Sequence, residues 1–380
     1  MKNIENFTSF TGEPAFEMKN IPIAIASSDE YAPFLGVLIQ SIVENSSEEW
    51  NYDIVVLSKN IRKFNRDLLD REVEGYKNFS IRYFDITNYL SKYEFHTDYH
   101  ITIMTYSRLA MIDIFENYDK VIYLDCDVVL TDDIQKLFNV DLEDKFIAAA
   151  RDTVIAGIVN LDKDAEDLID EKIRYQQLSY NTNVLGIKDP TQYFNAGIIV
   201  VNLKEIEKYY KGEDLLKIAA SKDWKWFDQD VLNKICYGKT VILPQTWNVM
   251  SHDWNREGIQ TENLAPDFIC KEYNEARQRP QAIHYCGHCI PCFAPCVDNA
   301  EKFWYYAQKT EFYERILFTM ASAATYNILY YGNGHLSLAR RIADKLFPKG
   351  SRRRELLKKV MPRGSWQFEF LKKMYHKFTI

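Results

Sequence analysis

Residues 121–127 read Val-Ile-Tyr-Leu-Asp-Cys-Asp, and this stretch decides the fold. The first four residues are all apolar, which indicates a strand that is buried on both faces, as in a parallel sheet. Alternate residues of an extended chain point to the same side, so Asp125 and Asp127 can converge on one cation. Ligands of open α/β sheets bind at the carboxyl ends of the strands. A bare Asp-x-Asp can also begin a loop or cap a helix starting near Asp133, and the pair alone does not decide between these interpretations.

Strand-like and helix-like patterns alternate on both sides of this stretch. Strands are predicted over residues 21–26, 52–57, 79–86, 121–124, 146–150, 193–201, 240–243 and 282–285. Helices are predicted over residues 31–45, 61–75, 106–117, 228–237 and 299–317. The order predicts an α/β fold with a mostly parallel sheet, crossover helices and consecutive strands side by side.

Composition limits the class of protein. The chain has 380 residues, of which 47% are hydrophobic, and a formal net charge of −7, so it can bury a large core and nucleic acid is not expected as a partner. Residues 1–20 lack the apolar stretch of a secretion signal, and no run approaches the roughly 18 apolar residues of a membrane span. The seven cysteines form no spaced disulfide framework. We therefore expect a cytoplasmic protein with reduced thiols.

Three parts are predicted along the chain: an N-terminal extension over residues 1–20, one α/β domain over residues 21–317, and a helical, basic C-terminal region over residues 318–380. The last part carries 13 Lys/Arg against 3 Asp/Glu between residues 336 and 380. Apolar residues recur there at helical spacing, namely Phe370, Leu371, Met374, Tyr375 and Phe378. A basic amphipathic helix of this kind is typical of segments that bind an anionic membrane surface, here the inner face. A solvated helix packed on the body is the alternative.

The carboxylate pair belongs to a series of six short motifs. They are residues 25–31 (Ile-Ala-Ser-Ser-Asp-Glu-Tyr), 105–109 (Thr-Tyr-Ser-Arg-Leu), 123–127 (Tyr-Leu-Asp-Cys-Asp), 193–197 (Tyr-Phe-Asn-Ala-Gly), 228–233 (Asp-Gln-Asp-Val-Leu-Asn) and 284–287 (His-Tyr-Cys-Gly). In this order they resemble the pattern of glycosyltransferase family 8, which includes bacterial lipopolysaccharide galactosyl- and glucosyltransferases and glycogenin. Each motif alone is weak, but the series is specific and extends over roughly residues 21–317.

The resemblance implies a GT-A fold and a retaining, Mn²⁺-dependent (or Mg²⁺-dependent) transfer of glucose or galactose from a UDP-hexose donor. The acceptor would be a glycan or glycolipid, such as a lipid-linked sugar or a polysaccharide. The implied metal ligands are Asp125, Asp127 and His284. The implied catalytic residues are Asp228 and Gln229. The implied substrate-binding residues are Ala26, Ser28, Tyr31, Arg108, Asp125, Asp152, Asn195, Ala196 and Gly287.

The same resemblance implies individual roles. Tyr31 would stack on the uracil, and Asn195 and Asp228 would bind hydroxyls of the donor sugar. Gln229 would lie near the anomeric carbon, and Asp152 would contact the acceptor. Taken singly, each of these residues also has a structural explanation, such as a core tyrosine or a turn asparagine.

One motif departs from the family pattern. The family usually has a lysine that contacts the diphosphate and a tryptophan two residues later, where this chain has Ile290 and Cys292. An isoleucine cannot supply positive charge. Either His288 or the metal alone compensates, or the donor is held differently, or the activity is weak.

The same region contains a cluster of cysteines, Cys286, Cys289, Cys292 and Cys296. The C-x₂-C-x₂-C-x₃-C spacing is similar to an iron–sulfur run, and thiolates also accept Zn²⁺. An alternative function is therefore a non-catalytic sugar-nucleotide-binding or metal-sensing protein that uses this cluster. The cluster can also be a cysteine-rich loop without a metal.

Overall fold

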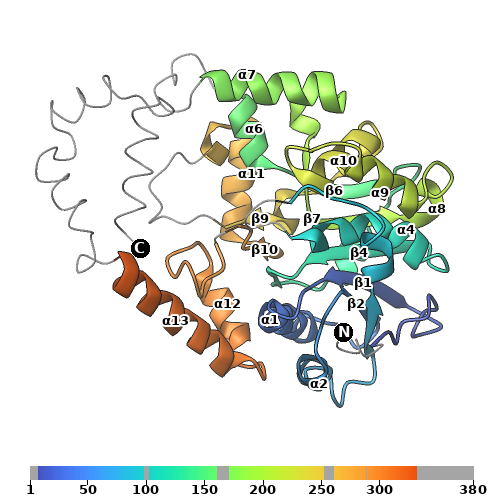
Figure 1. Ribbon diagram of the computed structural model, residues 1–380, viewed down its shortest axis with the longest axis vertical. Coiled ribbons are helices and arrows are strands. Elements are labelled where there is room, and N and C mark those ends of the chain that lie inside the picture. Colours follow the sequence, from blue (N-terminus) through green and yellow to red (C-terminus); the bar gives the residue numbers. More distant parts are fainter. Residues whose placement is uncertain (1–6, 98–101, 161–170, 252–260, 288, 332–380) are drawn as a thin grey trace, which may run out of the picture. The chain divides into compact units, whose positions relative to one another are not determined.

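The computed structural model describes residues 7–97, 102–160, 171–251, 261–287 and 289–331 (Figure 1). The chain divides into two compact units, Met1–Ile316 and Leu317–Ile380. Most of the predicted basic region lies outside the described residues. Residues 7–19 form no separate part, because Phe10 is 2% exposed and the backbone N–H groups of Ser9 and Phe10 donate to the carbonyl of Tyr83.

A seven-stranded sheet forms the centre of the first unit, in the order β3-β2-β1-β4-β7-β6-β8 (Figure 1). Its strands are β1 (Asn20–Ala26), β2 (Asn51–Ser58), β3 (Phe79–Asp85), β4 (Lys120–Asp125), β6 (Ile147–Arg151), β7 (Phe194–Asn202) and β8 (Thr240–Ile242). All neighbouring pairs are parallel except that β7 runs antiparallel to β4 and β6. The mixed α/β fold with a mainly parallel sheet is confirmed.

A second, three-stranded sheet contains β5 (Val128–Leu130), β10 (Ala282–His284) and β9 (Val249–Met250), in that order. Strand β5 follows β4 after only two residues, and β10 pairs antiparallel with β5 so that His284 faces Val128. The backbone N–H of Tyr285 also donates to the carbonyl of Asp127 at 3.0 Å. This small sheet therefore brings a residue from the end of the domain back to the carboxyl end of β4.

Helices lie on both sides of the large sheet (Figure 1). The α-helices are α1 (Ala32–Glu44), α2 (Lys63–Arg71), α3 (Thr87–Leu90), α4 (Met111–Ile114), α5 (Gln135–Phe138), α6 (Thr153–Val159), α7 (Glu171–Tyr180), α8 (Leu203–Ile206), α9 (Gly212–Ala220), α10 (Phe227–Cys236), α11 (Asp267–Gln278), α12 (Ala300–Ala307) and α13 (Tyr313–Tyr331). Shorter turns of helix are η1 (Ile103–Ala110), η3 (Asn181–Leu185), η4 (Pro190–Gln192), η5 (Gln245–Trp247) and η6 (Thr261–Leu264). Within the described residues, no helix combines the length and apolar character that a membrane span requires.

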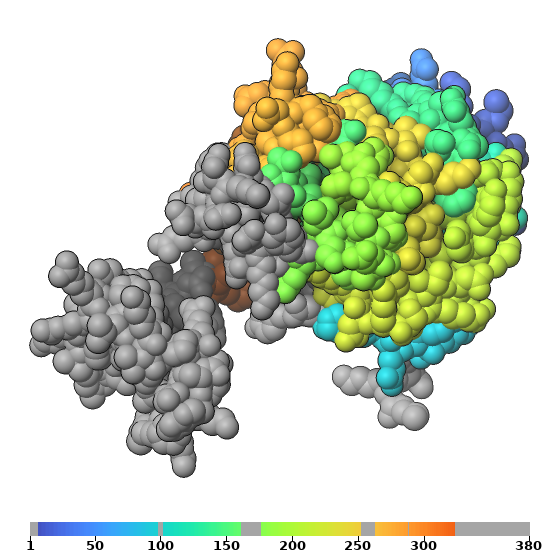
Figure 2. Space-filling view, turned by 90° about the horizontal axis from the view of Figure 1, so that it is seen from above, coloured from blue at the N-terminus to red at the C-terminus, as the bar shows by residue number. Residues whose placement is uncertain are grey.

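The core follows from the alternation of side chains along the strands. Ala24 of β1, Val55 of β2 and Tyr123 of β4 point to one face and pack with residues of η1, α9 and α10 in one buried cluster. Because β1 and β4 are buried along nearly their whole length, their sequences are continuous apolar runs. Segments far apart in the sequence also meet at the surface: α6, α7, η6 and α11 gather on the face seen in Figure 2.

Each of the eight predicted strands is confirmed to within one residue at each end. The prediction that consecutive strands lie side by side holds for β1, β2 and β3, but is wrong afterwards, because β4 returns to pair with β1 and β7 inserts between β4 and β6.

Two helix predictions are wrong. The helix expected over residues 106–117 is a 3₁₀ segment, η1, that begins at Ile103 and continues into the short α4. The helix expected over residues 299–317 is two helices, because a turn around Thr310 separates α12 from α13. The Thr310 hydroxyl donates to the carbonyl of Ala307 and accepts the backbone N–H of Phe312.

Candidate active site

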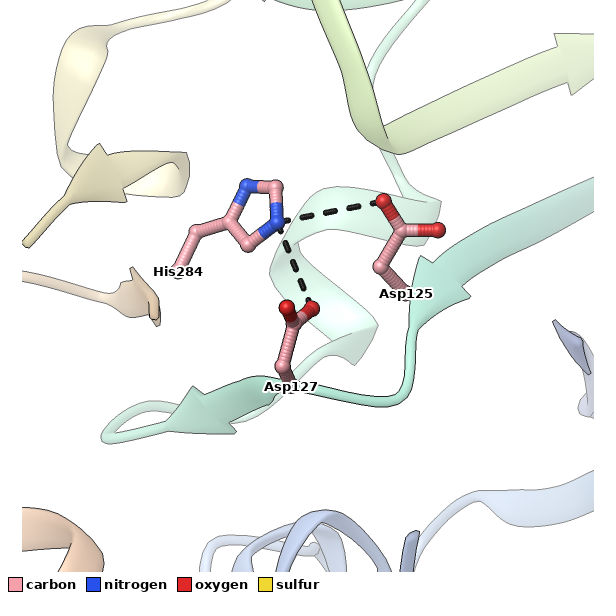
Figure 3. A group of neighbouring side chains, drawn as sticks. All are labelled: Asp125, Asp127 and His284. Carbon is pink, nitrogen blue, oxygen red and sulfur yellow. Dashed lines mark ion pairs between the residues drawn. The ribbon is translucent and has the colours of Figure 1, made fainter. Parts of the chain in front are cut away.

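Three potential metal ligands meet at the carboxyl end of β4 (Figure 3). Asp125 is the last residue of β4, Asp127 lies in the turn before β5, and His284 is the last residue of β10. Their ligand atoms all lie within 4.8 Å of one another. Nε2 of His284 lies 3.4 Å from Oδ1 of Asp127 and 3.8 Å from Oδ2 of Asp125.

The space between these side chains depends on Gly197 of β7. A Cβ atom at this position would lie 2.2 Å from Cε1 of His284 and 2.8 Å from Oδ2 of Asp125, both too close for a normal contact. Carboxylates and imidazoles are side chains that bind divalent metal ions in proteins. The residues therefore fit a divalent cation.

Burial and neighbouring charges shift the pKa values of Asp125 and His284. Burial raises the pKa of Asp125, the guanidinium of Arg108 acts against that rise, and the neighbouring Asp127 adds to it. Burial lowers the pKa of His284, but Asp127 and Asp125 outweigh it and the net pKa is raised. A bound cation is the largest charge in such a site and would reverse this balance.

Arg108 of η1 holds four elements together beside the ligands. Its Nη2 donates to Oδ1 of Asp125 at 2.8 Å, its Nε pairs with Oδ2 of Asp228 at 2.8 Å, and its Nη1 donates to the carbonyl of Ala196. The guanidinium also lies 4.4 Å from the ring centroid of Tyr123. Burial alone would lower the pKa of Arg108, but Asp125 and Asp228 raise it, so the side chain stays charged.

Asp228, the second residue of α10, is buried, and its Oδ2 has an ion-pair contact but no hydrogen-bond partner. Thr105 donates from its hydroxyl to Oδ1, and Arg108 pairs with Oδ2. Burial raises the pKa of Asp228 to about 6, against the opposing charge of Arg108. The carboxylate is thus a charge partner of Arg108 at the centre of the site.

A second group of side chains surrounds Asp152, the N-cap of α6. Oδ2 of Asp152 accepts from Nδ2 of Asn195 at 3.2 Å and from Nε2 of Gln229 at 3.1 Å, while Oδ1 accepts from the backbone of α6. Oε1 of Gln229 accepts the backbone N–H of Ala196 at 2.9 Å. The structure thus brings together nine sequence-predicted residues, namely Arg108, Asp125, Asp127, Asp152, Asn195, Ala196, Asp228, Gln229 and His284.

The other predicted residues lie around this network. Ala26 ends β1 directly opposite Asp125, and the carbonyl of Ser28 accepts the backbone N–H of Tyr31. Tyr31 precedes α1 and is 36% exposed; burial, Cys126 and Asp127 raise the pKa of its hydroxyl. Gly287 follows β10 with φ of +67°, a conformation that favours glycine.

Several residues of the site were not predicted from the sequence. Thr105 and Tyr123 belong to the quoted motifs, but no role was assigned to them. Tyr193 donates to Oδ1 of Asp230 at 2.8 Å and lies beside Gln229. Asn248, which precedes β9 and contacts both His284 and Asn195, belongs to none of the quoted motifs. Asn248 follows a tryptophan in an irregular stretch, and nothing in the neighbouring sequence predicts that its side chain is buried and hydrogen-bonded.

The cysteine cluster does not form a metal site in the described part of the chain. Among those residues, the only group of three or more histidine, cysteine or acidic side chains with ligand atoms within 4.8 Å is Asp125, Asp127 and His284. Within the cluster, Cys292 is buried and Cys296 is exposed. The expectation of Zn²⁺ or an iron–sulfur cluster is therefore not supported by the described residues.

Ile290 stands where the family has a lysine and is 3% exposed. Its carbonyl accepts the backbone N–H groups of Phe293 and Ala294. The position is thus part of the packed loop. His288, the proposed substitute, lies outside the described residues.

Comparison with known proteins identifies the family. The model of glycosyl transferase family 8 matches residues 22–291 of this chain. The chain belongs to glycosyltransferase family 8. A putative glycosyltransferase of Haemophilus influenzae is 29% identical over 281 residues, which cover 70% of this chain and 71% of the relative.

Solved structures of the family share the fold. The bifunctional glycosyltransferase WbbM superposes with a TM-score of 0.69 and 29% identity over 81% of this chain; the match spans 52% of the WbbM chain. The galactosyltransferase LgtC, solved with donor and acceptor sugar analogues, superposes with a TM-score of 0.59 and 23% identity over 77% of this chain and 96% of its own. The GT-A fold is confirmed, and the family 8 chain is a glycosyltransferase by class.

Proposed function

We propose that this family 8 chain transfers a hexose, glucose or galactose, from a UDP-hexose to a lipid-linked or polysaccharide acceptor, with retention of configuration and with Mn²⁺. The observation that carries the proposal is the convergence of Asp125, Asp127 and His284 in a space that Gly197 leaves free. LgtC, a galactosyltransferase solved with donor and acceptor sugar analogues, supports the substrate class.

Asp125, Asp127 and His284 would hold the metal. A divalent cation in this position supplies a Lewis acid for the negative charge that develops on the leaving diphosphate. Arg108 contributes a fixed positive charge beside it and is held by Asp125, Asp228 and Ala196, so it need not reorganise during the reaction. This fixed charge supports a role for Arg108 in place of the family lysine.

On the sugar side, Asn195 and Gln229 both donate to Oδ2 of Asp152. Asn195 would bind a hydroxyl of the donor sugar, Gln229 would lie near the anomeric carbon, and Asp152 would contact the acceptor. Because Asp228 is ion-paired with the buried Arg108 and accepts from Thr105, we propose that retention does not pass through a glycosyl ester on this residue. The acceptor hydroxyl would then attack from the face that the leaving group occupies.

The test is UDP release from UDP-glucose and UDP-galactose with and without Mn²⁺, comparing wild type, Asp127→Asn and Asp144→Asn. Asp127→Asn removes a ligand charge, so we expect its Mn²⁺-dependent rate to fall at least 100-fold, on the scale of about 1.4 kcal/mol for each factor of ten. Asp144 is an exposed carboxylate that pairs with Lys239, so its variant controls for the loss of one acidic group. Full activity of Asp127→Asn, or no turnover of either donor by wild type with Mn²⁺, would refute the proposal.

A further inference from the structure

Asn248 lies between the metal ligands and the sugar-side group. Its side chain is fully buried, with 0% exposure. Oδ1 faces Nδ1 of His284 at 3.1 Å, and Nδ2 donates to Oδ1 of Asn195 at 3.0 Å. The side chain of Asn248 therefore links His284 to Asn195.

The orientation of this asparagine follows from one backbone donor. The N–H of Gly197 can only donate, and it points at Oδ1 of Asn195 at 3.0 Å, which makes that atom an acceptor. The Asn248 atom that faces the same oxygen must then be the amide nitrogen. Its amide oxygen is therefore the atom that faces His284.

The tautomer of His284 follows in turn. An amide oxygen only accepts, so Nδ1 of His284 carries the proton and donates it to Asn248. This leaves the lone pair of Nε2 directed at the shared space of Asp125 and Asp127. Partners of this kind fix the ring orientation and tautomer of metal-binding histidines.

Asn248 is itself rigidly held. Its backbone N–H donates to the carbonyl of Gln245 at 3.1 Å, and its carbonyl accepts from Nε2 of Gln245 at 2.9 Å. On its far side, Asn195 donates to Asp152, which also accepts from Gln229. The hydrogen-bonded chain therefore runs from His284 through Asn248 and Asn195 to Asp152 and Gln229.

We infer that Asn248 is a positioning residue: it holds His284 in the Nδ1–H tautomer for the metal and links the metal ligands to the residues that would bind the donor sugar. The inference rests on the proposed function in taking His284 as a ligand. The side chain of Asn248 has two contacts with separate roles. We call the contact of Oδ1 with His284 the acceptor arm and the hydrogen bond from Nδ2 to Asn195 the donor arm.

Two variants separate the arms, with Mn²⁺ affinity measured by the EPR signal of free Mn²⁺ in the full-length protein. Asn248→Leu removes both arms, so we expect Mn²⁺ binding to weaken by about 10- to 100-fold. Asn248→Asp keeps an acceptor toward His284 but removes the donor to Asn195. Its Mn²⁺ affinity should equal or exceed that of wild type, while kcat/KM for the UDP-hexose falls at least 10-fold.

Asn181→Leu is the matched control, because Asn181 is also a buried asparagine with a side-chain hydrogen bond, here to Gln177 in the segment of α7 and η3. It should change stability but not Mn²⁺ affinity. Unchanged Mn²⁺ affinity of Asn248→Leu would overturn the acceptor arm, as would equal losses in Asn248→Leu and Asn248→Asp. An unchanged kcat/KM of Asn248→Asp would overturn the donor arm.

A second measurement decides the tautomer without metal. In ¹⁵N-histidine-labelled wild type at high pH, the His284 signals, assigned by their loss in His284→Gln, should show a protonated Nδ1 and a bare Nε2. A neutral ring protonated at Nε2 would contradict the inference even if Asn248→Leu did not fold. If wild type binds no Mn²⁺, the proposed function fails, and the tautomer still decides the role of Asn248.

Discussion

At the scale of the residue, Gly197 shows how closely the ligands are packed. Its hydrogen faces a space that His284 and Asp125 border, and a Cβ there would lie 2.2 Å from the imidazole. Strand β7 is buried around this position, so the backbone cannot move away without breaking its pairing with β4 and β6. The glycine is required by its neighbours and not by its own backbone conformation.

We therefore expect Gly197→Ala to abolish Mn²⁺ binding and transfer while the protein still folds, with a stability loss of roughly 1–3 kcal/mol from overpacking. Gly186→Ala is the control: Gly186 has φ of +79° and open space around it, so alanine there costs stability without touching the site. Calorimetric titration with Mn²⁺ checks the prediction. Normal Mn²⁺ affinity in Gly197→Ala would show that the cation does not use this space.

Predictability also differs from residue to residue. Asp125 and Asp127 became candidate metal ligands because they stand at the end of a fully apolar strand and belong to one of the six motifs, and both of these are local patterns. Asn248 could not be predicted, because its partners His284 and Asn195 come from strands 36 and 53 residues away. A hydrogen bond across such a separation leaves no pattern in the neighbouring sequence.

At the scale of the element, η1 was predicted to be α-helical but is a 3₁₀ helix, and its contacts give the reason. A 3₁₀ segment has three residues per turn, so residues three apart lie above one another. Thr105 and Arg108 are three apart, and both reach Asp228. The periodicity of the sequence indicated a helix, but the polar contacts that tighten it come from α10 and β4.

Short elements were missed for a related reason. Strands β5 and β9 have three and two residues, too few to show alternation, and they exist because β10 pairs with both. Helix α11 did carry a signal: its buried residues Ile269, Tyr273 and Ala276 recur at helical spacing. The spacing of these residues is therefore sufficient to predict α11 from the sequence.

The end of α2 provides a test of stability against pH. Glu72 is buried, accepts the backbone N–H of Glu311 at 3.0 Å, and has its pKa raised by burial from 4.5 to about 7. The folded protein therefore keeps a proton that the unfolded chain releases between about pH 4.5 and 7. Stability from this group is present below pH 4.5 and is lost as the pH rises through 7.

Glu72→Gln removes this titration and keeps an acceptor oxygen for Glu311. We expect the variant to be more stable than wild type at pH 8, by on the order of 1–3 kcal/mol, and to differ little at pH 4.5, because one pKa unit corresponds to about 1.4 kcal/mol. Urea unfolding at both pH values measures this, with the exposed Glu74→Gln as control. If Glu72→Gln changed the free energy of unfolding equally at both pH values, the change would come from packing and not from the titration of Glu72.

At the scale of the whole molecule, the site exists because two sheets meet at the end of β4. The large sheet supplies Asp125, Asn195 and Gly197, and the small sheet supplies His284. The rule that consecutive strands lie side by side correctly predicts the pairing of β1, β2 and β3. It does not predict that β4 pairs with β1 or that β7 is antiparallel to its neighbours. Those pairings are decided by packing between distant segments, so the sequence-based topology stopped being correct at that point.

The basic C-terminal region remains a prediction, since residues 332–380 lie outside the described part. We propose that it binds an anionic membrane surface, with the boundary of the catalytic domain near residue 317. Replacing Arg352, Arg353, Arg354, Lys358 and Lys359 by Gln in the full chain should reduce flotation with anionic vesicles at least 100-fold, given about 1 kcal/mol for each basic residue near the surface. Neutral vesicles are the control, and unchanged flotation would rule out an electrostatic anchor.

The central claim, a divalent metal held by Asp125, Asp127 and His284 for sugar transfer from a nucleotide donor, is tested most directly by crystals soaked with Mn²⁺ and UDP-hexose. Anomalous scattering at the manganese edge should give one strong peak bordered by the two carboxylates and Nε2 of His284, with the diphosphate completing its coordination. A peak at another position, or a bound nucleotide without manganese at these three residues, would contradict the claim.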